Sequence, residues 1–294
     1  MNPNPSITPI AYLSNQSTKI DILRLDTIHP IVSGNKWFKL RYYVEDALQK
    51  KATTIASFGG PYSNHLVALA FVAKENNLKS IGYVRSNEGE PITPTLQEAL
   101  NYGMDLIFLG RSTFQEKKAL LLSAQNKDET TAIYYIDEGG YGILGTKGAA
   151  TIMSEAALNY DYVVCAVGTG TMIAGLINAS KPDQKIIGIT VLKNEGTIYE
   201  EIKSLLQDPN KPYTLLHTFH LGGYAKTTPA QIEFMNQLWD YAQIPTDIVY
   251  TSKVLMAVTQ LVKENYFASN SKVLVIHSGG LQGNRSLNKG VLNY

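Results

Sequence analysis

The sequence contains a single cysteine, and this scarcity limits how the fold can be stabilised. Cys165 has no partner for an internal disulfide and lies within an apolar run. Disulfides accumulate in oxidising compartments, so a chain that forms none is typical of a reducing cytoplasm. Hydrophobic side chains make up 44% of the 294 residues, which is enough for a substantial core without cross-links. We therefore expect a globular, cytoplasmic protein.

The chain also lacks an excess of charge and any long apolar run. Its 26 basic and 25 acidic residues give a net charge of +1, and lysine and arginine form no dense cluster. Nucleic acids and acidic membranes are bound by such clusters. No segment approaches the roughly 20 apolar residues of a membrane span, and the first residues carry no basic flank before an apolar stretch. Small molecules are the expected partners, with no nucleic acid and no membrane.

Apolar, β-branched runs recur along the chain and predict buried strands. They lie at 52–58, 80–85, 104–109, 132–136, 161–167, 185–191, 214–219 and 272–276. Segments with helical periodicity lie between many of them, for example 64–76, 95–101 and 146–159. Alternating strands and helices are typical of parallel sheets covered by helices. We predict an α/β protein with mostly parallel sheets flanked by helices.

Lys36 lies where a predicted turn enters an amphipathic helix. Gly34 and Asn35 supply turn chemistry, and the apolar residues that follow have the spacing of one helix face. A lysine attacks an aldehyde only after losing a proton, which requires partial desolvation or nearby positive charge such as Lys39. The alternative is a solvated lysine at a helix start, where the helix dipole disfavours a cation.

The segment 168–171, Gly-Thr-Gly-Thr, follows a predicted strand and precedes a helical stretch. Its backbone N–H groups and two hydroxyls can converge on an anion such as a phosphate. The rival interpretation is a dinucleotide site, but the strand at 185–191 ends in Leu192 and Lys193 where a ribose-binding acid is expected. A tight turn without a ligand is the second alternative. A phosphate site combined with a placed lysine suggests pyridoxal phosphate.

Three further groups of residues end predicted strands or glycine pairs. Ser63, Asn64 and His65 follow Gly-Gly at a strand-to-helix junction, where they either bind a carboxylate or cap the helix. Tyr224 follows two glycines and Tyr250 precedes a threonine; each packs by default but can stack on a cofactor ring or move protons. The other candidates at strand ends are Thr251 and Ser278. His277 precedes Ser278 at the end of a predicted strand. The remaining histidines, His29, His217 and His220, lack metal-ligand spacing, and no metal is predicted.

Taken in order, these segments make the chain resemble the family of pyridoxal-phosphate enzymes that contains 1-aminocyclopropane-1-carboxylate deaminase and D-cysteine desulfhydrase. The resemblance covers nearly the whole chain and rests on Gly-Asn-Lys-x-x-Lys-Leu at 34–40 and Gly-Gly-x-x-Ser-Asn at 59–64. It implies a two-domain, tryptophan-synthase-β-like fold of type II. The larger cofactor domain would comprise 1–42 and 146–294, and the smaller inserted domain 43–145. It also implies a homodimer.

The resemblance also implies a role for each candidate. Lys36 would form the Schiff base with pyridoxal 5'-phosphate and then remove the α-proton of the substrate as general base. The implied catalytic residues are Lys36, Ser63, Tyr224 and Tyr250. The implied cofactor-binding residues are Lys36, Asn64, Gly168, Thr169, Gly170, Thr171, Thr251 and Ser278. The implied substrate-binding residues are Ser63, Asn64 and His65.

Two positions favour one activity within the family. Thr251 stands where the cyclopropane deaminases carry a glutamate for the pyridine nitrogen, and His65 where they typically have glutamine. A hydroxyl holds that nitrogen protonated less firmly, so the ring is a weaker electron sink and a good leaving group is needed. We therefore expect D-cysteine desulfhydrase-like β-elimination to sulfide, pyruvate and ammonia. The alternatives are deamination of the cyclopropane substrate to 2-oxobutanoate and ammonia, racemisation or dehydration of another amino acid, and non-catalytic cofactor carriage.

Overall fold

The computed structural model describes residues 4–87, 89–125, 132–193, 196–223 and 225–294, and the chain divides into two compact units. Unit 1 comprises Met1–Asn35 and Ala149–Tyr294, and unit 2 comprises Lys36–Gly148. These boundaries separate two groups of residues that each pack compactly. The domains expected from the sequence, divided at 42/43 and 145/146, remain a prediction about independently folding parts.

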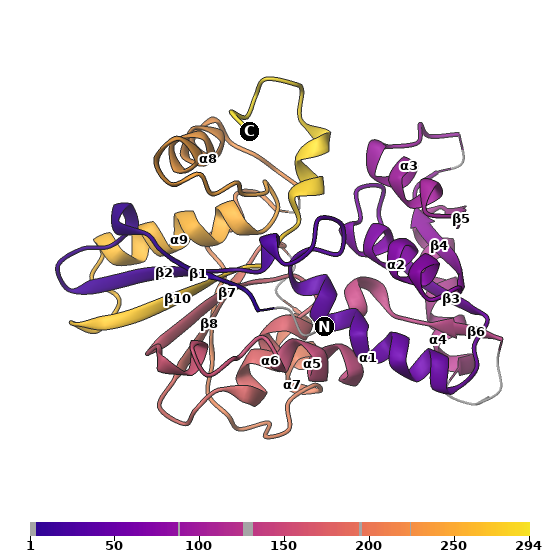
Figure 1. The fold of residues 1–294 in the computed structure, drawn as a ribbon, viewed down its shortest axis with the longest axis horizontal. Coiled ribbons are helices and arrows are strands. Elements are labelled where there is room, and N and C mark those ends of the chain that lie inside the picture. The colour runs from indigo at the N-terminus through magenta and orange to yellow at the C-terminus, as the bar shows by residue number, and fades with distance from the viewer. Residues whose placement is uncertain (1–3, 88, 126–131, 194–195, 224) are drawn as a thin grey trace. The chain divides into compact units, whose positions relative to one another are not determined.

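Unit 1 is built on a six-stranded sheet with the order β1-β2-β10-β7-β8-β9. Its strands are β1 (Ile7–Pro9), β2 (Thr18–Arg24), β7 (Tyr162–Val167), β8 (Lys185–Thr190), β9 (Thr214–Leu216) and β10 (Ser271–His277). All neighbouring strands are parallel except β1, which pairs antiparallel with β2. Its helices are α6 (Thr171–Ala179), α7 (Ile198–Lys203), α8 (Pro229–Ala242) and α9 (Thr251–Lys263). Helices α8 and α9 lie on one face of the sheet, and α6 and α7 on the other (Figure 1).

The core of unit 1 follows from strands that are apolar on both faces. Every residue of β7 is buried, as a strand covered by helices on both sides requires. Val164 and Ala166 of this strand share a core cluster with Val254 and Val258 of α9. This packing brings the first turn of α9 towards the carboxyl end of the sheet.

Unit 2 is built on a four-stranded parallel sheet with the order β5-β4-β3-β6. Its strands are β3 (Thr54–Gly59), β4 (Lys79–Arg85), β5 (Met104–Leu109) and β6 (Ile133–Tyr135). Helix α1 (Asn35–Gln49) starts at the end of unit 1, and the others are α2 (Asn64–Glu75), α3 (Pro94–Asn101), α4 (Arg111–Gln125) and α5 (Ile143–Ala150). Phe58 stacks on Tyr83 with ring centroids 5.1 Å apart and meets Phe114 edge-on.

The α/β prediction with mostly parallel sheets is confirmed, and the predicted strands from 52 onwards lie close to those found. The helix predicted over 146–159 is wrong in its second half. Helix α5 ends at Ala150, and the N–H groups of Ile152 and Met153 bond three residues back before a short 3-10 turn at Ala157–Asn159. The prediction failed because the apolar residues after Ala150 keep a helical spacing although the backbone there forms turns. Within the residues described, no helix is long and apolar enough to cross a membrane.

Candidate functional site

The turn between β7 and α6 is shaped to hold an anion. Gly170 precedes α6 with a φ of +76°, and a Cβ there would lie 2.8 Å from a side-chain carbon of Ile202, so a glycine is needed. Among the described residues no side chain caps α6, although Thr171 is completely buried. The N–H groups of a buried helix start need acceptors, and a phosphate supplies them. The hydroxyls of Thr169 and Thr171 lie 3.1 Å apart beside these groups.

Tyr250 lies against the first residue of this turn. A Cβ built on Gly168 would be 3.4 Å from Cε1 of the Tyr250 ring, so the phenol covers the glycine at van der Waals distance. Tyr250 immediately precedes α9, and its side chain lies beside the turn because that helix packs on β7. The structure therefore brings together two segments that the sequence predicts to share a site.

Asp247 fixes the start of α9 and was missed by sequence reasoning. Its carboxylate is fully buried and accepts hydrogen bonds from the N–H groups of Val249, Tyr250 and Thr251, each at 2.8 Å, and from the Thr251 hydroxyl at 2.7 Å. Burial raises the pKa of Asp247, and the bonds from Thr251 oppose that shift. The available signal was an aspartate four residues ahead of Thr251, because aspartate side chains often accept hydrogen bonds from backbone N–H groups a few residues on. The hydroxyl proton of Thr251 is thus held by a carboxylate.

The start of α1 is fixed at the carboxyl end of β10. Gly34 has a φ of +66°, and a Cβ on it would lie 1.9 Å from the carbonyl oxygen of Ser278. The Asn35 N–H donates to that same oxygen at 3.1 Å, and the Gly34 N–H donates to Leu25 O at 2.7 Å. Lys36 is the second residue of α1. It therefore directly follows two residues, Gly34 and Asn35, whose backbone N–H groups are held by hydrogen bonds.

Within unit 2, His65 is surrounded by positive charge and shielded from water. Its side chain is 2% exposed, and burial, followed by the charges of Lys36 and Lys39, holds the pKa of His65 well below its ordinary value. Lys39 is itself buried, and its ammonium donates to Gly139 O at 3.3 Å. His65 is therefore a neutral imidazole at neutral pH.

Ser57, which no sequence motif singled out, selects the tautomer of that imidazole. The Ser57 hydroxyl donates to Ile136 O at 2.8 Å and so accepts from Nε2–H of His65, 2.7 Å away. Nδ1 of His65 then carries a lone pair, and it has no hydrogen-bond partner among the described residues although it is buried. Buried polar atoms are nearly always satisfied, so this nitrogen is available to accept a hydrogen bond from a water molecule or a ligand.

Ser63 and Asn64 lie at the start of α2, next to His65. The Ser63 hydroxyl accepts a hydrogen bond from the Leu66 N–H at 3.3 Å, so the capping role considered for this residue is present. Its proton can still be donated to a substrate carboxylate, and its substrate role remains a prediction, as does the contact of Asn64 with the cofactor. Tyr224 lies outside the described residues.

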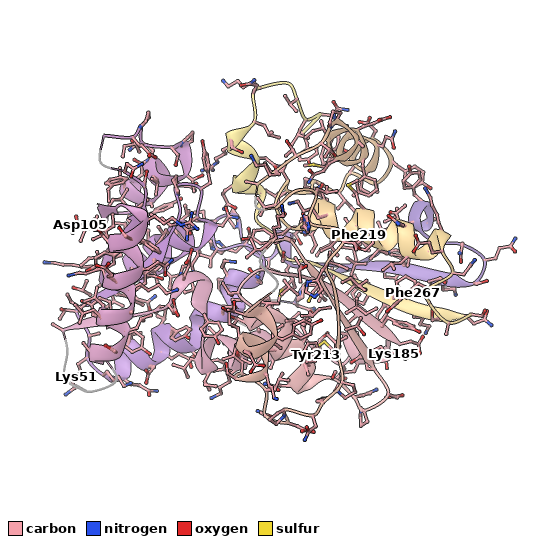
Figure 2. The ribbon with its side chains drawn as sticks, turned by 180° about the vertical axis from the view of Figure 1, so that it is seen from behind. Lys51, Asp105, Lys185, Tyr213, Phe219 and Phe267 are labelled. Atoms are coloured by element: carbon pink, nitrogen blue, oxygen red, sulfur yellow. The ribbon has the colours of Figure 1, made fainter. Side chains whose placement is uncertain are left out.

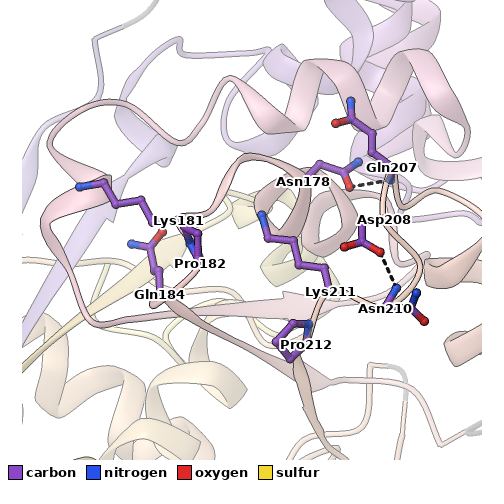
Figure 3. A pocket seen from close by; sticks show the side chains of 9 residues that line it. All are labelled: Asn178, Lys181, Pro182, Gln184, Gln207, Asp208, Asn210, Lys211 and Pro212. Atoms are coloured by element: carbon purple, nitrogen blue, oxygen red, sulfur yellow. Dashed lines mark hydrogen bonds between the residues drawn. The ribbon is translucent and has the colours of Figure 1, made fainter.

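A cavity of about 430 Å³ in unit 1 involves none of the predicted site residues. Figure 3 shows its lining, in which polar side chains are joined by two prolines: Asn178, Lys181, Pro182, Gln184, Gln207, Asp208, Asn210, Lys211 and Pro212. His29 and His220 accept hydrogen bonds from nearby backbone N–H groups, and His217 bonds to Thr190 and Tyr199. Within the residues described, no cluster of metal-ligating side chains occurs.

Together these features define a class of enzyme. Two α/β units with parallel sheets, a buried uncapped helix start behind a glycine turn, and a lysine entering a helix from a fixed backbone fit an enzyme that holds a phosphorylated aldehyde cofactor. The family model described as pyridoxal-phosphate dependent enzyme matches residues 2–279. The chain belongs to this family, and pyridoxal phosphate is its cofactor.

Individual relatives cover almost the whole chain. A Thermotoga maritima protein, provisionally named 1-aminocyclopropane-1-carboxylate deaminase, is 27% identical over 94% of this chain and 94% of its own length. A D-cysteine desulfhydrase of Salmonella choleraesuis is 28% identical over 93% of this chain and 91% of its own. A solved structure described as an ACC deaminase homologue shares 24% identity with a TM-score of 0.81, covering 96% of this chain and 90% of that one. This last likeness shows the fold.

Proposed function

We propose that the protein catalyses β-elimination from D-cysteine, giving hydrogen sulfide, pyruvate and ammonia. The observation that carries the proposal is the environment of Thr251, which stands where the cyclopropane deaminases have glutamate. Its hydroxyl proton is held by the buried Asp247, so this position offers the pyridine nitrogen a hydroxyl oxygen in place of a carboxylate. When bound, pyridoxal phosphate withdraws electrons from the α-carbon, and a modest withdrawal suffices when the leaving group is a thiolate.

The residues of the chain bind the cofactor and the substrate and transfer protons. Lys36 accepts the α-proton of the substrate as general base. Ser63 donates its hydroxyl proton to the substrate carboxylate, and Asn64 contacts the phenolic oxygen of the cofactor. Tyr250 and Tyr224 position the ring and transfer protons. The Gly168–Thr171 turn binds the phosphate, and Ser278 lies at the pyridine edge.

His65 suits a substrate thiol better than a cyclopropane ring. Its neutral imidazole presents Nδ1 as a buried acceptor, and the nearby charges of Lys36 and Lys39 disfavour a further proton on it. A cysteine thiol can donate to such an acceptor, whereas a cyclopropane ring carries no donor at the corresponding carbons. This difference supports a sulfur-containing substrate.

The second candidate is 1-aminocyclopropane-1-carboxylate deamination to 2-oxobutanoate and ammonia. It is supported by the provisional name of the Thermotoga maritima relative, which is about as similar to this chain as the desulfhydrase from Salmonella choleraesuis. The proposal also includes a homodimer and a cytoplasmic location, which rest on the family resemblance and on the single cysteine.

A parallel assay of the cofactor-loaded protein tests the proposal. D-cysteine, L-cysteine and 1-aminocyclopropane-1-carboxylate are supplied separately, and sulfide, pyruvate and 2-oxobutanoate are measured, with Lys36→Ala as the background control. We expect sulfide and pyruvate in equal amounts from D-cysteine. Release of 2-oxobutanoate from the cyclopropane without sulfide from D-cysteine would favour the second candidate and contradict the argument from Thr251.

A further inference from the structure

Lys253 is a lysine that the proposed chemistry does not use, yet it is one of the most deeply buried side chains of the protein. It lies in the first turn of α9 with no exposed surface. Its ammonium donates to two backbone carbonyl oxygens, His220 O at 2.9 Å and Gly223 O at 2.7 Å. Lysine is rarely buried unless its charge is compensated, so this arrangement needs a reason.

The loop that receives this ammonium has an unusual backbone. Leu221, Gly222 and Gly223 have φ angles of +51°, +92° and +119°, three consecutive residues in the left-handed region. Leu221 pays a conformational cost there that glycine does not. The loop is closed by the Gly223 N–H, which donates to His220 O at 3.0 Å. Two carbonyl oxygens thus turn towards one point, which the Lys253 ammonium occupies.

The position of Lys253 connects two segments of the proposed site. It follows Tyr250 by three residues on the same helix start, and Tyr250 covers Gly168 of the phosphate turn. The loop that it holds runs in sequence directly into Tyr224. A single side chain therefore joins the segment that carries one proposed active-site tyrosine to the residues that precede the other.

We propose that Lys253 is a positioning residue. Its ammonium fixes the His220–Gly223 loop, which directly precedes Tyr224 in the sequence, to the start of α9, and the activity assigned to Tyr224 depends on this anchor. The inference rests on the proposed function, because Tyr224 and Tyr250 are assigned to the ring and its protons there. It adds to the proposed function a residue that acts by anchoring the segment before Tyr224.

A double-mutant cycle tests the inference. Lys253→Met keeps the length and apolar stem of the side chain and removes the charge, and Tyr224→Phe removes the phenol hydroxyl. If Lys253 acts through Tyr224, each variant lowers kcat by about 10- to 100-fold and the double variant is no slower than Tyr224→Phe alone. Lys263→Met, at the exposed end of the same helix, is the matched control and leaves kcat unchanged.

Two further measurements keep the test independent of turnover and of folding. The visible circular dichroism of the bound cofactor reports its surroundings, and we expect the same non-additive pattern there. Amide exchange of residues 217–223 should accelerate in Lys253→Met while the exchange of β7 stays unchanged. Additive effects of the two substitutions, or an unchanged loop in Lys253→Met, would overturn the inference.

Failure of the inference can be separated from failure of the proposed function. If the wild-type protein binds the cofactor but turns over no substrate of the panel, the dichroism and exchange measurements still decide the role of Lys253. A supplementary variant, Lys253→Ala, leaves the two carbonyl oxygens without their cation. Rising ammonium concentration should then restore the wild-type dichroism in part, whereas no recovery combined with unfolded protein would show a purely structural role.

Discussion

At Gly34, two backbone segments approach too closely for any side chain to fit between them. A methyl group there would lie 1.9 Å from Ser278 O, in a residue that also has a φ of +66°. Gly89 has a φ of +87° but nothing within 4 Å of an added Cβ. An alanine at this position would therefore show the conformational penalty of a positive φ without a steric clash.

We predict that Gly34→Ala destabilises the protein more than Gly89→Ala. The conformational penalty common to both is about 1–2 kcal/mol, and the clash should add at least about 2 kcal/mol at Gly34. Urea unfolding of the two variants measures the difference, and cofactor absorbance shows whether the start of α1 has moved. Equal losses of stability would contradict the close approach of Gly34 and Ser278.

Individual residues show where sequence reasoning reached its limit. The pattern around Lys36 was sufficient to predict a helix start, because its determinants are local. The contact between Gly34 and Ser278 was not predictable, since it depends on β2 and β10 becoming neighbours in the sheet. The role of Ser57 was likewise not predictable, because it depends on a hydrogen bond with His65 on another element.

At the scale of elements, the junction of β7 and α6 is the proposed binding site of the cofactor phosphate. We predict that replacing Thr169 and Thr171 together by valine weakens cofactor binding by about 10- to 100-fold, because valine keeps the shape but removes two donors to a charged group. Thr259→Val is the matched control, since that hydroxyl donates to Leu255 O within α9. Titration of the cofactor-free protein with pyridoxal phosphate gives the dissociation constants, and inorganic phosphate should compete. Unchanged cofactor affinity in the double variant would show that the phosphate does not bind at this turn.

Most elements were predictable because parallel strands are apolar throughout and are interrupted by helices. The run predicted at 104–109, for example, is strand β5 itself. Helical periodicity was a poorer guide over 146–159, where the hydrogen bonds change to those of turns after Ala150. Periodicity describes which side chains are apolar, whereas the end of a helix depends on where its backbone groups find partners.

At the scale of the whole molecule, the buried Lys253 makes stability depend on pH. Burial lowers the pKa of Lys253 from 10.5 to about 8, even though Asp247 acts in the opposite direction. Between these two values the unfolded chain binds more protons than the folded one, so the free energy of unfolding rises with pH. We predict a gain of about 2 kcal/mol between pH 8 and pH 10 from this residue.

Other groups set the upper limit of that range and define the control. Burial raises the pKa of Tyr43 and Tyr134, and also of Tyr83, Tyr160, Tyr213 and Tyr294. These tyrosines ionise first in the unfolded chain, so they lower stability as the pH approaches and passes 10 and offset the gain from Lys253. Urea unfolding at pH 8 and pH 10 therefore compares variants that share these tyrosines. The change in the free energy of unfolding between the two pH values should be about 2 kcal/mol more favourable in wild type and in Lys263→Met than in Lys253→Met, and an equal change in all three proteins would assign the effect to another group.

The measurement that tests the central claim most directly is the identification of the lysine that carries the cofactor. Cofactor that is not bound to the protein is first removed. The loaded protein is then reduced with borohydride and digested, and mass spectrometry locates the pyridoxyl group. We predict the modification at Lys36 and its loss, with retained secondary structure, in Lys36→Arg. A pyridoxyl group found instead at Lys39 or Lys253, or on no lysine at all, would contradict the account.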